Sequence, residues 1–302
     1  MRVINPVVWS DAMITSSSVA EPAASETAWV SGGTYALNDL RIRSTTHRVY
    51  QCVQAHTGIA TLPELDATRW LDIGPTLKWA MFDGAVNTQT TNASSLSVVL
   101  LPGSIVTGLY LGELVGSSVT ITQKTAPGGT VVYSKTINLD GTLIADWYQY
   151  FFEPFSQLVS VVLTDLPPYL GCEITVTITG TGTVKCGILS TGQAYSLGSL
   201  QYGAAATILD YSSKTTDAYG TTKLVKRPYS KRMTGKLYIE TGALNKTHSL
   251  LATLRSTPCV WIGVDSDLYA NPLVVFGYYK DFSIEITYPT FNVCSLQLEG
   301  LV

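Results

Sequence analysis

The sequence predicts an all-β protein, and three observations support this fold class. Apolar and polar residues alternate over short segments, which is the pattern of half-buried strands. Gly and Pro turn signals separate these segments, and only one segment has helical periodicity. The chain also contains 17 Tyr and 46% hydrophobic residues against only 14% charged residues. We therefore expect a small β domain followed by two antiparallel β-sandwich domains of the jelly-roll type.

The length of 302 residues is enough for two or three domains. Changes in composition and periodicity divide the chain into four parts. These are an N-terminal arm or linker (1–25), a small module (26–76), a β-sandwich domain (77–192) and a C-terminal β domain (193–302).

The N-terminal part is rich in Ser, Ala and Thr after Trp9 and has no periodicity, which predicts an arm or linker. Val7, Val8 and Trp9 would allow this arm to dock on a neighbouring subunit. Asn5 and Pro6 interrupt the apolar residues, so we do not expect a signal peptide here.

The sandwich region contains short strand patterns separated by turn signals such as Ala126 to Gly129. Alternation on both sides of Gly180-Thr-Gly182 predicts a β-hairpin with its turn at Thr181. The expected strands are 97–101, 118–122, 130–139, 148–152, 158–163, 173–179 and 184–188.

The C-terminal region begins with a loop-rich stretch after Gly192 and continues with further strand patterns. A short helix is expected at 245–255, where Asn245 can cap the first turn and three leucines supply an apolar face. The expected strands are 236–240, 260–264, 273–279, 282–288 and 294–298.

The chain carries few charges, with a formal net charge of -3 and a mean hydropathy of +0.21. This composition excludes a disordered polymer, and it excludes a protein that binds nucleic acid over its whole surface. No run of about 18 apolar residues is free of Pro, Gly or charge, so membrane insertion is not expected. We expect instead that other subunits cover part of the surface and that the protein is a homo-oligomer.

The sequence contains no clear motif for a metal site, a disulfide framework or a cofactor. The five cysteines contain no Cys-x-x-Cys pair, which argues against a disulfide framework and a zinc site, so buried thiols are expected. No Gly-rich phosphate-binding motif occurs, and no cofactor is predicted. Asp265 and Asp267 lie in a loop that could ligate calcium through oxygen atoms, but a solvated turn explains the same residues and no metal site is predicted.

No catalytic residue is predicted. The chain lacks a Gly-x-Ser-x-Gly elbow, and its histidines, His47, His56 and His248, have no evident nucleophile as a neighbour in the sequence. A pair of carboxylates is sufficient for a glycosidase, so the acidic residues leave that alternative open.

A cluster of six basic residues, with no acidic residue among them, lies between 223 and 236. Such a cluster predicts contact with an anion or with an acidic face of a partner, and a solvated loop is the alternative. Pro228 and Tyr229 favour an ordered segment. The six residues are Lys223, Lys226, Arg227, Lys231, Arg232 and Lys236.

Aromatic side chains of the small module are candidates for sugar binding, because sugars place their CH surfaces against flat aromatic faces. We predict Trp29, Tyr35 and Trp70 as carbohydrate contacts. A role in the core of the module is the alternative, and it is favoured for Tyr35 and Tyr50.

The small module contains in order Trp29-Val-Ser-Gly-Gly-Thr-Tyr35, Leu37-Asn-Asp39, Arg48-Val-Tyr-Gln-Cys-Val53 and Arg69-Trp70. This order resembles the chitin-binding type of carbohydrate-binding module that occurs on bacterial chitinases. The resemblance covers the small module only. It implies a carbohydrate-module-like β domain that contacts a host cell-envelope glycan.

Modules of this type also recur in virion proteins of tailed bacteriophages, and the rest of the chain is similar to tail, baseplate and tail-fibre proteins. The similarity lies in Leu77 to Gly84, in the β-sandwich that follows and in Cys294 to Leu301. It implies a non-enzymatic structural subunit of the virion, assembled in the host cytoplasm and bound to other tail or baseplate proteins.

Two alternatives stay open. A carbohydrate-binding protein or receptor-binding module would use the same aromatic residues. A polysaccharide-degrading enzyme of the tailspike type would use carboxylates on a β architecture, although the sequence lacks the long repeat array of parallel β-helix depolymerases.

Overall fold

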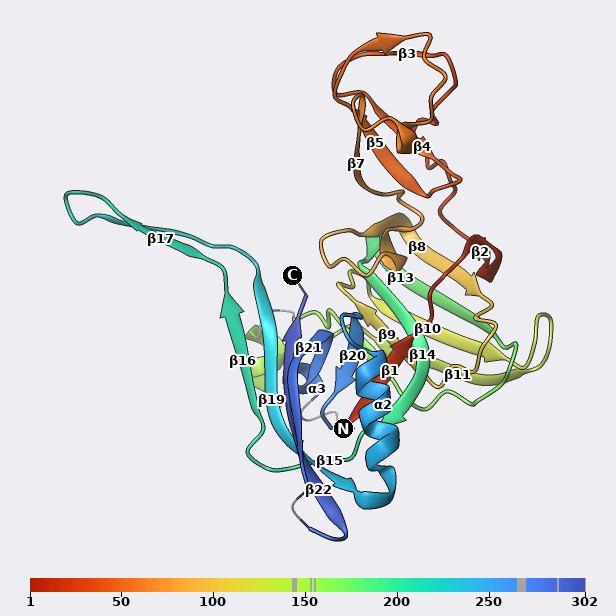
Figure 1. The fold of residues 1–302 in the computed structure, drawn as a ribbon. Coiled ribbons are helices and arrows are strands. Elements are labelled where there is room, and N and C mark those ends of the chain that lie inside the picture. Colours follow the sequence, from red (N-terminus) through yellow and green to blue (C-terminus); the bar gives the residue numbers. More distant parts are fainter. Residues whose placement is uncertain (143–145, 153, 155, 265–269, 287, 302) are drawn as a thin grey trace.

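The computed structural model describes all residues except 143–145, 153, 155, 265–269, 287 and 302. The fold is all-β, as predicted, and its strands form one large sheet, a five-stranded sheet and a small module at one end (Figure 1). A long hairpin projects from an edge of the large sheet (Figure 1).

The large sheet is antiparallel and follows the order β12-β9-β14-β1-β20-β21-β22-β19-β15, with β16 also paired to β19. Its strands are β1 (Arg2–Pro6), β9 (Gly108–Gly112), β12 (Val161–Leu163), β14 (Ile188–Ser196), β15 (Ser199–Leu200), β16 (Ala205–Asp210), β19 (Tyr229–Glu240), β20 (Cys259–Ile262), β21 (Val274–Glu285) and β22 (Phe291–Gly300).

The first residues of the chain are a central strand, which corrects the predicted arm or linker. β1 pairs with β14 on one side and with β20 on the other. Val3 and Ile4 are fully buried and face opposite sides of the sheet, because successive side chains of a strand alternate. β1 is too short to show a periodic pattern in the sequence. It forms a strand because it is hydrogen-bonded along both of its edges. The large sheet therefore runs through the predicted boundary at 192, which lies inside β14.

The five-stranded sheet follows the order β11-β10-β13-β8-β2 and forms a β-sandwich with part of the large sheet. Leu100, Ile121 and Ile174 from this sheet share one core with Leu109 and Leu189 from β9 and β14. Its strands are β2 (Ile14–Ser17), β8 (Thr90–Leu100), β10 (Ser118–Lys124), β11 (Val131–Asn138) and β13 (Glu173–Cys186).

The predicted hairpin at Gly180-Thr-Gly182 is wrong, because β13 is one strand through these residues. Both halves of β13 pair with β8, and the register shifts between Thr179 and Thr183. The glycines thus form an irregularity within a strand rather than a turn, since the long partner strand continues past them.

The predicted strand at 148–152 is also wrong. These residues belong to the short helix α1 (Trp147–Phe152), in which the Asp146 carboxylate accepts a hydrogen bond of 2.8 Å from the Gln149 backbone N–H. Aromatic residues favour strands, but an acidic N-cap followed three residues later by Gln is a helix-start signal.

In the C-terminal half, the two strands expected at 273–279 and 282–288 are one irregular strand, β21. The expected helix is confirmed as α2 (Leu244–Thr253), which packs Leu251 into a core with Val3 and Trp261. The predicted cap is wrong, because the N-cap is Ala243 and Asn245 lies inside the helix. The remaining helical elements are α3 (Ala270–Leu273) and single 3₁₀ turns at Asp11–Met13, Pro63–Leu65, Ala80–Phe82 and Thr241–Ala243.

The large sheet is curled. Tyr110 of β9 stacks on Phe276 of β21, with ring centroids 5.8 Å apart and planes at 6°, although β14, β1 and β20 lie between them in the sheet. The concave side therefore has its own apolar core, which includes Ile4, Ile188 and Val260.

The small module has a three-stranded sheet, β4-β5-β7, and a two-stranded sheet, β3-β6. Its core consists of Tyr35, Tyr50, Cys52 and Trp70. The strands are β3 (Thr34–Tyr35), β4 (Leu40–Arg43), β5 (Arg48–Cys52), β6 (His56–Thr57) and β7 (Trp70–Pro75).

All five cysteines are free and buried, which agrees with the expectation of buried thiols. Burial raises the pKa of the Cys186 and Cys259 thiols to about 12. These side chains therefore pack as small apolar groups.

Candidate functional site

Two of the three predicted sugar contacts are core residues. Tyr35 and Trp70 are only 4% and 3% exposed, and their rings meet edge to face with centroids 4.9 Å apart. The Tyr35 hydroxyl donates to the Val30 carbonyl at 2.6 Å and accepts from the Val30 N–H at 2.8 Å. Neither ring offers an open face to a sugar.

Trp29 is half-buried at the edge of this core. The Arg43 guanidinium lies over its ring at 5.3 Å from the centroid and also donates to Glu64 at 3.1 Å. The three predicted aromatic residues therefore do not form one exposed sugar-binding surface.

The structural role of Tyr35 predicts a modest loss of stability without its hydroxyl. Tyr35→Phe should lower the free energy of unfolding by about 1 kcal/mol, because two backbone groups of Val30 lose their partner. Urea unfolding followed by tryptophan fluorescence measures this change. Tyr202→Phe is the matched control, because Tyr202 is fully exposed; equal effects of the two substitutions would contradict the role of Tyr35.

His56 lies close to Cys52, four residues earlier in the chain, which corrects the expectation that none of the histidines has a nucleophile as a neighbour. Their Nδ1 and Sγ atoms are 3.8 Å apart, and the thiol donates to the Gln54 carbonyl at 3.1 Å. Desolvation raises the pKa of Cys52, so the thiol stays protonated and is a poor nucleophile.

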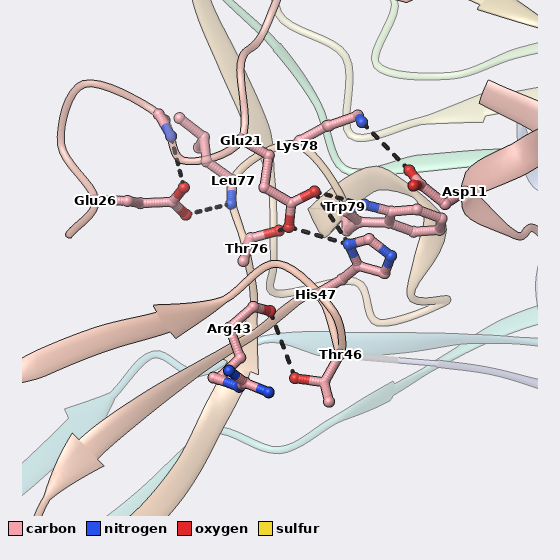
Figure 2. A network of polar contacts seen from close by, with 11 residues as sticks. Asp11, Glu21, Glu26, Arg43, Thr46, His47, Thr76, Leu77, Lys78 and Trp79 are labelled. Atoms are coloured by element: carbon pink, nitrogen blue, oxygen red, sulfur yellow. Dashed lines mark hydrogen bonds and ion pairs between the residues drawn. The ribbon is translucent and has the colours of Figure 1, made fainter. Parts of the chain in front are cut away.

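A buried carboxylate joins the small module to the sandwich. Figure 2 shows Glu21 accepting hydrogen bonds from Thr76 Oγ1 at 2.7 Å, from Trp79 Nε1 at 3.1 Å and from His47 Nδ1 at 3.0 Å. The Glu21 side chain is only 6% exposed. Its three donors come from two sides of the junction, so the carboxylate fixes the module in place.

The same junction contains a second carboxylate and a stacked ring pair. Glu26 accepts from the backbone N–H groups of Ala23 at 2.8 Å and Leu77 at 2.7 Å (Figure 2). The His47 ring stacks on Trp79 with centroids 4.0 Å apart. We call Glu21 and Glu26 together the clamp, because their carboxylates connect the small module to the sandwich.

The stretch after Gly192, which was expected to be rich in loops, instead contains the end of β14, the strands β15 and β16, and then a hairpin that we call the basic arm, residues 211–228. It contains β17 (Ser213–Thr216) and β18 (Thr222–Val225), which pair only with each other. Every residue from Lys214 to Tyr229 is exposed. At its tip, Asp217 accepts from the N–H groups of Tyr219 at 2.9 Å and Thr221 at 2.8 Å.

The predicted basic cluster divides into two groups. Lys223, Lys226 and Arg227 lie in the basic arm. Lys231, Arg232 and Lys236 lie on β19 in the large sheet, where Arg232 forms an ion pair of 2.8 Å with Glu299 and burial lowers the pKa of Lys231. Lys236 is exposed and lies opposite Ser295, farther along β19 from the arm.

A further cation, Lys214, joins the arm through strand pairing. Thr215, its neighbour, lies opposite Lys223, and Lys214 itself lies opposite Leu224. The sequence did not indicate it, because only the hairpin brings it close. Among the described residues, none of the arm cations Lys214, Lys223, Lys226 and Arg227 has a carboxylate within 4.0 Å.

Neither a cluster of metal-ligating side chains nor a membrane-spanning helix occurs among the described residues. The described part of the chain contains no group of three or more His, Cys, Asp or Glu side chains arranged to hold a metal ion. No helix among the described residues is long and apolar enough to span a membrane. Asp265 and Asp267 of the loop considered for calcium lie outside the described residues.

No protein-family model matches this chain. No curated protein sequence matches it either.

Proposed function

We propose that this chain is a non-enzymatic structural subunit of a tailed-phage virion, placed in the distal tail or baseplate and assembled with copies of itself and with other tail proteins. The basic arm is the observation that carries this proposal. A two-stranded hairpin is marginally stable in water by itself. An arm in which Lys214 to Pro228 are all exposed is therefore expected to be covered by a neighbour.

The charge of the arm suits a neighbouring copy. Its four cations face only one acidic residue of the arm, Asp217, whose carboxylate already caps the turn. The region 77–192 holds four lysines against seven acidic residues. An acidic sandwich on the next subunit thus complements the basic arm.

The helix α1 is a second surface that supports assembly. Trp147, Tyr148, Tyr150, Phe151 and Phe152 are each between 61% and 79% exposed. Aromatic side chains bury roughly 150–250 Å² each, so these five offer roughly 500–850 Å², about one side of a standard protein interface. Such a patch is large for a surface that stays in water.

Two measurements test this proposal. Light scattering coupled to size-exclusion chromatography of the full chain should give a multiple of the subunit mass. Antibodies against the chain should label the end of the tail in electron micrographs of the phage particles that carry it. A monomer at micromolar concentration, together with unlabelled particles, would exclude the structural role.

A further inference from the structure

A pocket of about 430 Å³ lies where the N-terminal strand, the small module and the sandwich meet. His47 and Arg48 of the module form one wall, and Ile188 and Leu189 of β14 form another. This volume is in the range of ligand pockets. The pocket is made by parts of the chain that are far apart in sequence.

Aromatic rings form much of the pocket lining, with Trp9, Trp79, Phe82 and Phe276 all contributing. The Phe82 ring lies 5.7 Å from the Trp9 ring at an angle of 57°, and 5.7 Å from the Trp79 ring at 63°, measured between centroids. Trp9 and Phe82 are only partly buried. Rings at such angles suit a cation or an apolar group, because each ring face carries partial negative charge.

One carboxylate in the lining has no cation bound to it. Asp83 is exposed, and it accepts from the Ala85 N–H and from Thr88 Oγ1, each at 2.8 Å. A carboxylate has about four acceptor positions, so some remain open. Among the described residues, no nitrogen of a Lys, Arg or His side chain lies within 4.0 Å of it.

The other charged groups at the pocket are already paired. Nε of Arg48 donates to both carboxylate oxygens of Asp72, at 3.0 and 2.8 Å, and Nδ1 of His47 lies 3.0 Å from Glu21. The pocket therefore has a surplus negative charge at Asp83. An anionic occupant would be repelled there, and an apolar occupant would cover a carboxylate without giving it a partner, which costs free energy.

The basic arm supplies cations that have no carboxylate partner. Its exposed hairpin projects away from the small module of its own subunit (Figure 1). The arm cations therefore have to find an acidic site on another molecule. They are Lys214, Lys223, Lys226 and Arg227.

We propose that this pocket receives a cationic side chain from the basic arm of a neighbouring copy of the chain. The ammonium or guanidinium group pairs with the Asp83 carboxylate, and its aliphatic stem packs against Trp9 and Phe82. This inference rests on the proposed function, since it names where the arm binds on the next subunit. Because the arm and the pocket are different surfaces, the contact can repeat from copy to copy and close a ring.

Asp83→Asn tests the pairing, and Asp140→Asn is its matched control. Both aspartates precede a glycine and accept from the N–H two residues ahead, at 2.8 Å for Ala85 and 2.9 Å for Thr142. Asparagine keeps this acceptor, so both variants should melt at the temperature of the unmodified chain. In light scattering over a dilution series, Asp83→Asn should raise the concentration at which the assembly dissociates by about tenfold or more, and Asp140→Asn by less than about twofold.

An exchange of charges tests whether the arm and Asp83 meet directly. Asp83→Lys should prevent assembly, and adding Lys223→Glu with Lys226→Glu should restore it, because the signs are then exchanged between the two surfaces. The same two arm substitutions combined with Asp140→Lys should not restore assembly. Phe82→Leu keeps an apolar side chain and removes the ring, so it should raise the dissociation concentration by about threefold to tenfold.

The outcomes separate this contact from the structural role. Equal effects of Asp83→Asn and Asp140→Asn in a chain that assembles, or a charge exchange that restores assembly no better than its Asp140 control, would overturn the pocket contact and leave the structural role standing. A full chain that stays monomeric throughout the dilution series would overturn both.

Discussion

If the chain assembles as proposed, removal of the basic arm is expected to convert the oligomer into a monomer. The arm can be cut out cleanly, because Asp210 and Tyr229 are paired across β16 and β19. Replacing residues 211–228 with Asn-Gly would join these two residues by the two-residue turn that antiparallel strands prefer. Light scattering should then give the subunit mass, with a melting temperature close to that of the unmodified chain.

The reason is that the arm forms almost no contacts within its own subunit. Residues Lys214 to Pro228 are exposed throughout, so their deletion removes little buried surface from the subunit. The deletion would also remove the basic surface that a neighbouring subunit is proposed to cover. A deletion variant that folds and keeps the mass of the unmodified assembly would contradict the arm as the assembly element.

Charge reversal tests whether assembly depends on the positive charge of the arm, because the hairpin keeps its full length. Lys223→Glu with Lys226→Glu should raise the concentration at which the assembly dissociates by about tenfold or more, since like charges then face an acidic neighbour. Lys246→Glu with Lys280→Glu makes the same change of net charge at exposed sites outside the arm. Equal effects of the two pairs would show that only the total charge matters.

Removal of the Glu21 carboxylate is expected to cost about 3–5 kcal/mol of unfolding free energy. Glu21→Ala leaves three donors without their acceptor, on His47, Thr76 and Trp79. Thr76 is fully buried and Trp79 is 9% exposed, so water does not readily replace the lost contacts. Urea unfolding followed by tryptophan fluorescence measures the loss.

An ion pair at the same junction whose carboxylate is exposed provides the control. Asp11 lies 3.7 Å from Lys78, and its side chain is 68% exposed. Asp11→Ala should therefore change the unfolding free energy by less than about 0.5 kcal/mol. If Glu21→Ala cost no more than this, the clamp would not hold the module on the sandwich.

The elements that were predicted well are those whose pattern is local. The strand β10, which was expected at 118–122, and the helix α2 follow from alternation and from helical periodicity. The large sheet shows the limit of such patterns. β1 is only five residues long, and its place between β14 and β20 is set by pairing with strands distant in sequence.

The errors occurred where a local signal met a stronger tertiary or capping interaction. The glycines at 180 and 182 are turn formers, but β8 pairs with β13 on both sides of them. The aromatic residues of α1 favour a strand, but the Asp146 cap starts a helix.

For the candidate sites too, the sequence located residues that are neighbours in the chain and missed what depends on the fold. The sequence alone located the cations of residues 223–227, because they are neighbours in the chain. It grouped them with Arg232, which the fold pairs with Glu299, and it omitted Lys214, which only the hairpin brings close. Likewise it named Tyr35 and Trp70 for sugar contact, whereas packing of the small module buries both rings.

By itself the sequence determined that this protein is all-β, that it has few charges, and that its thiols are buried. These properties depend on composition and on periodicity along short segments. Only the tertiary structure decided which aromatic rings face a pocket and which form a core. It also decided that the basic arm leaves the sheet and that Glu21 binds His47 and Trp79, because these arrangements depend on contacts between residues that are far apart in the chain.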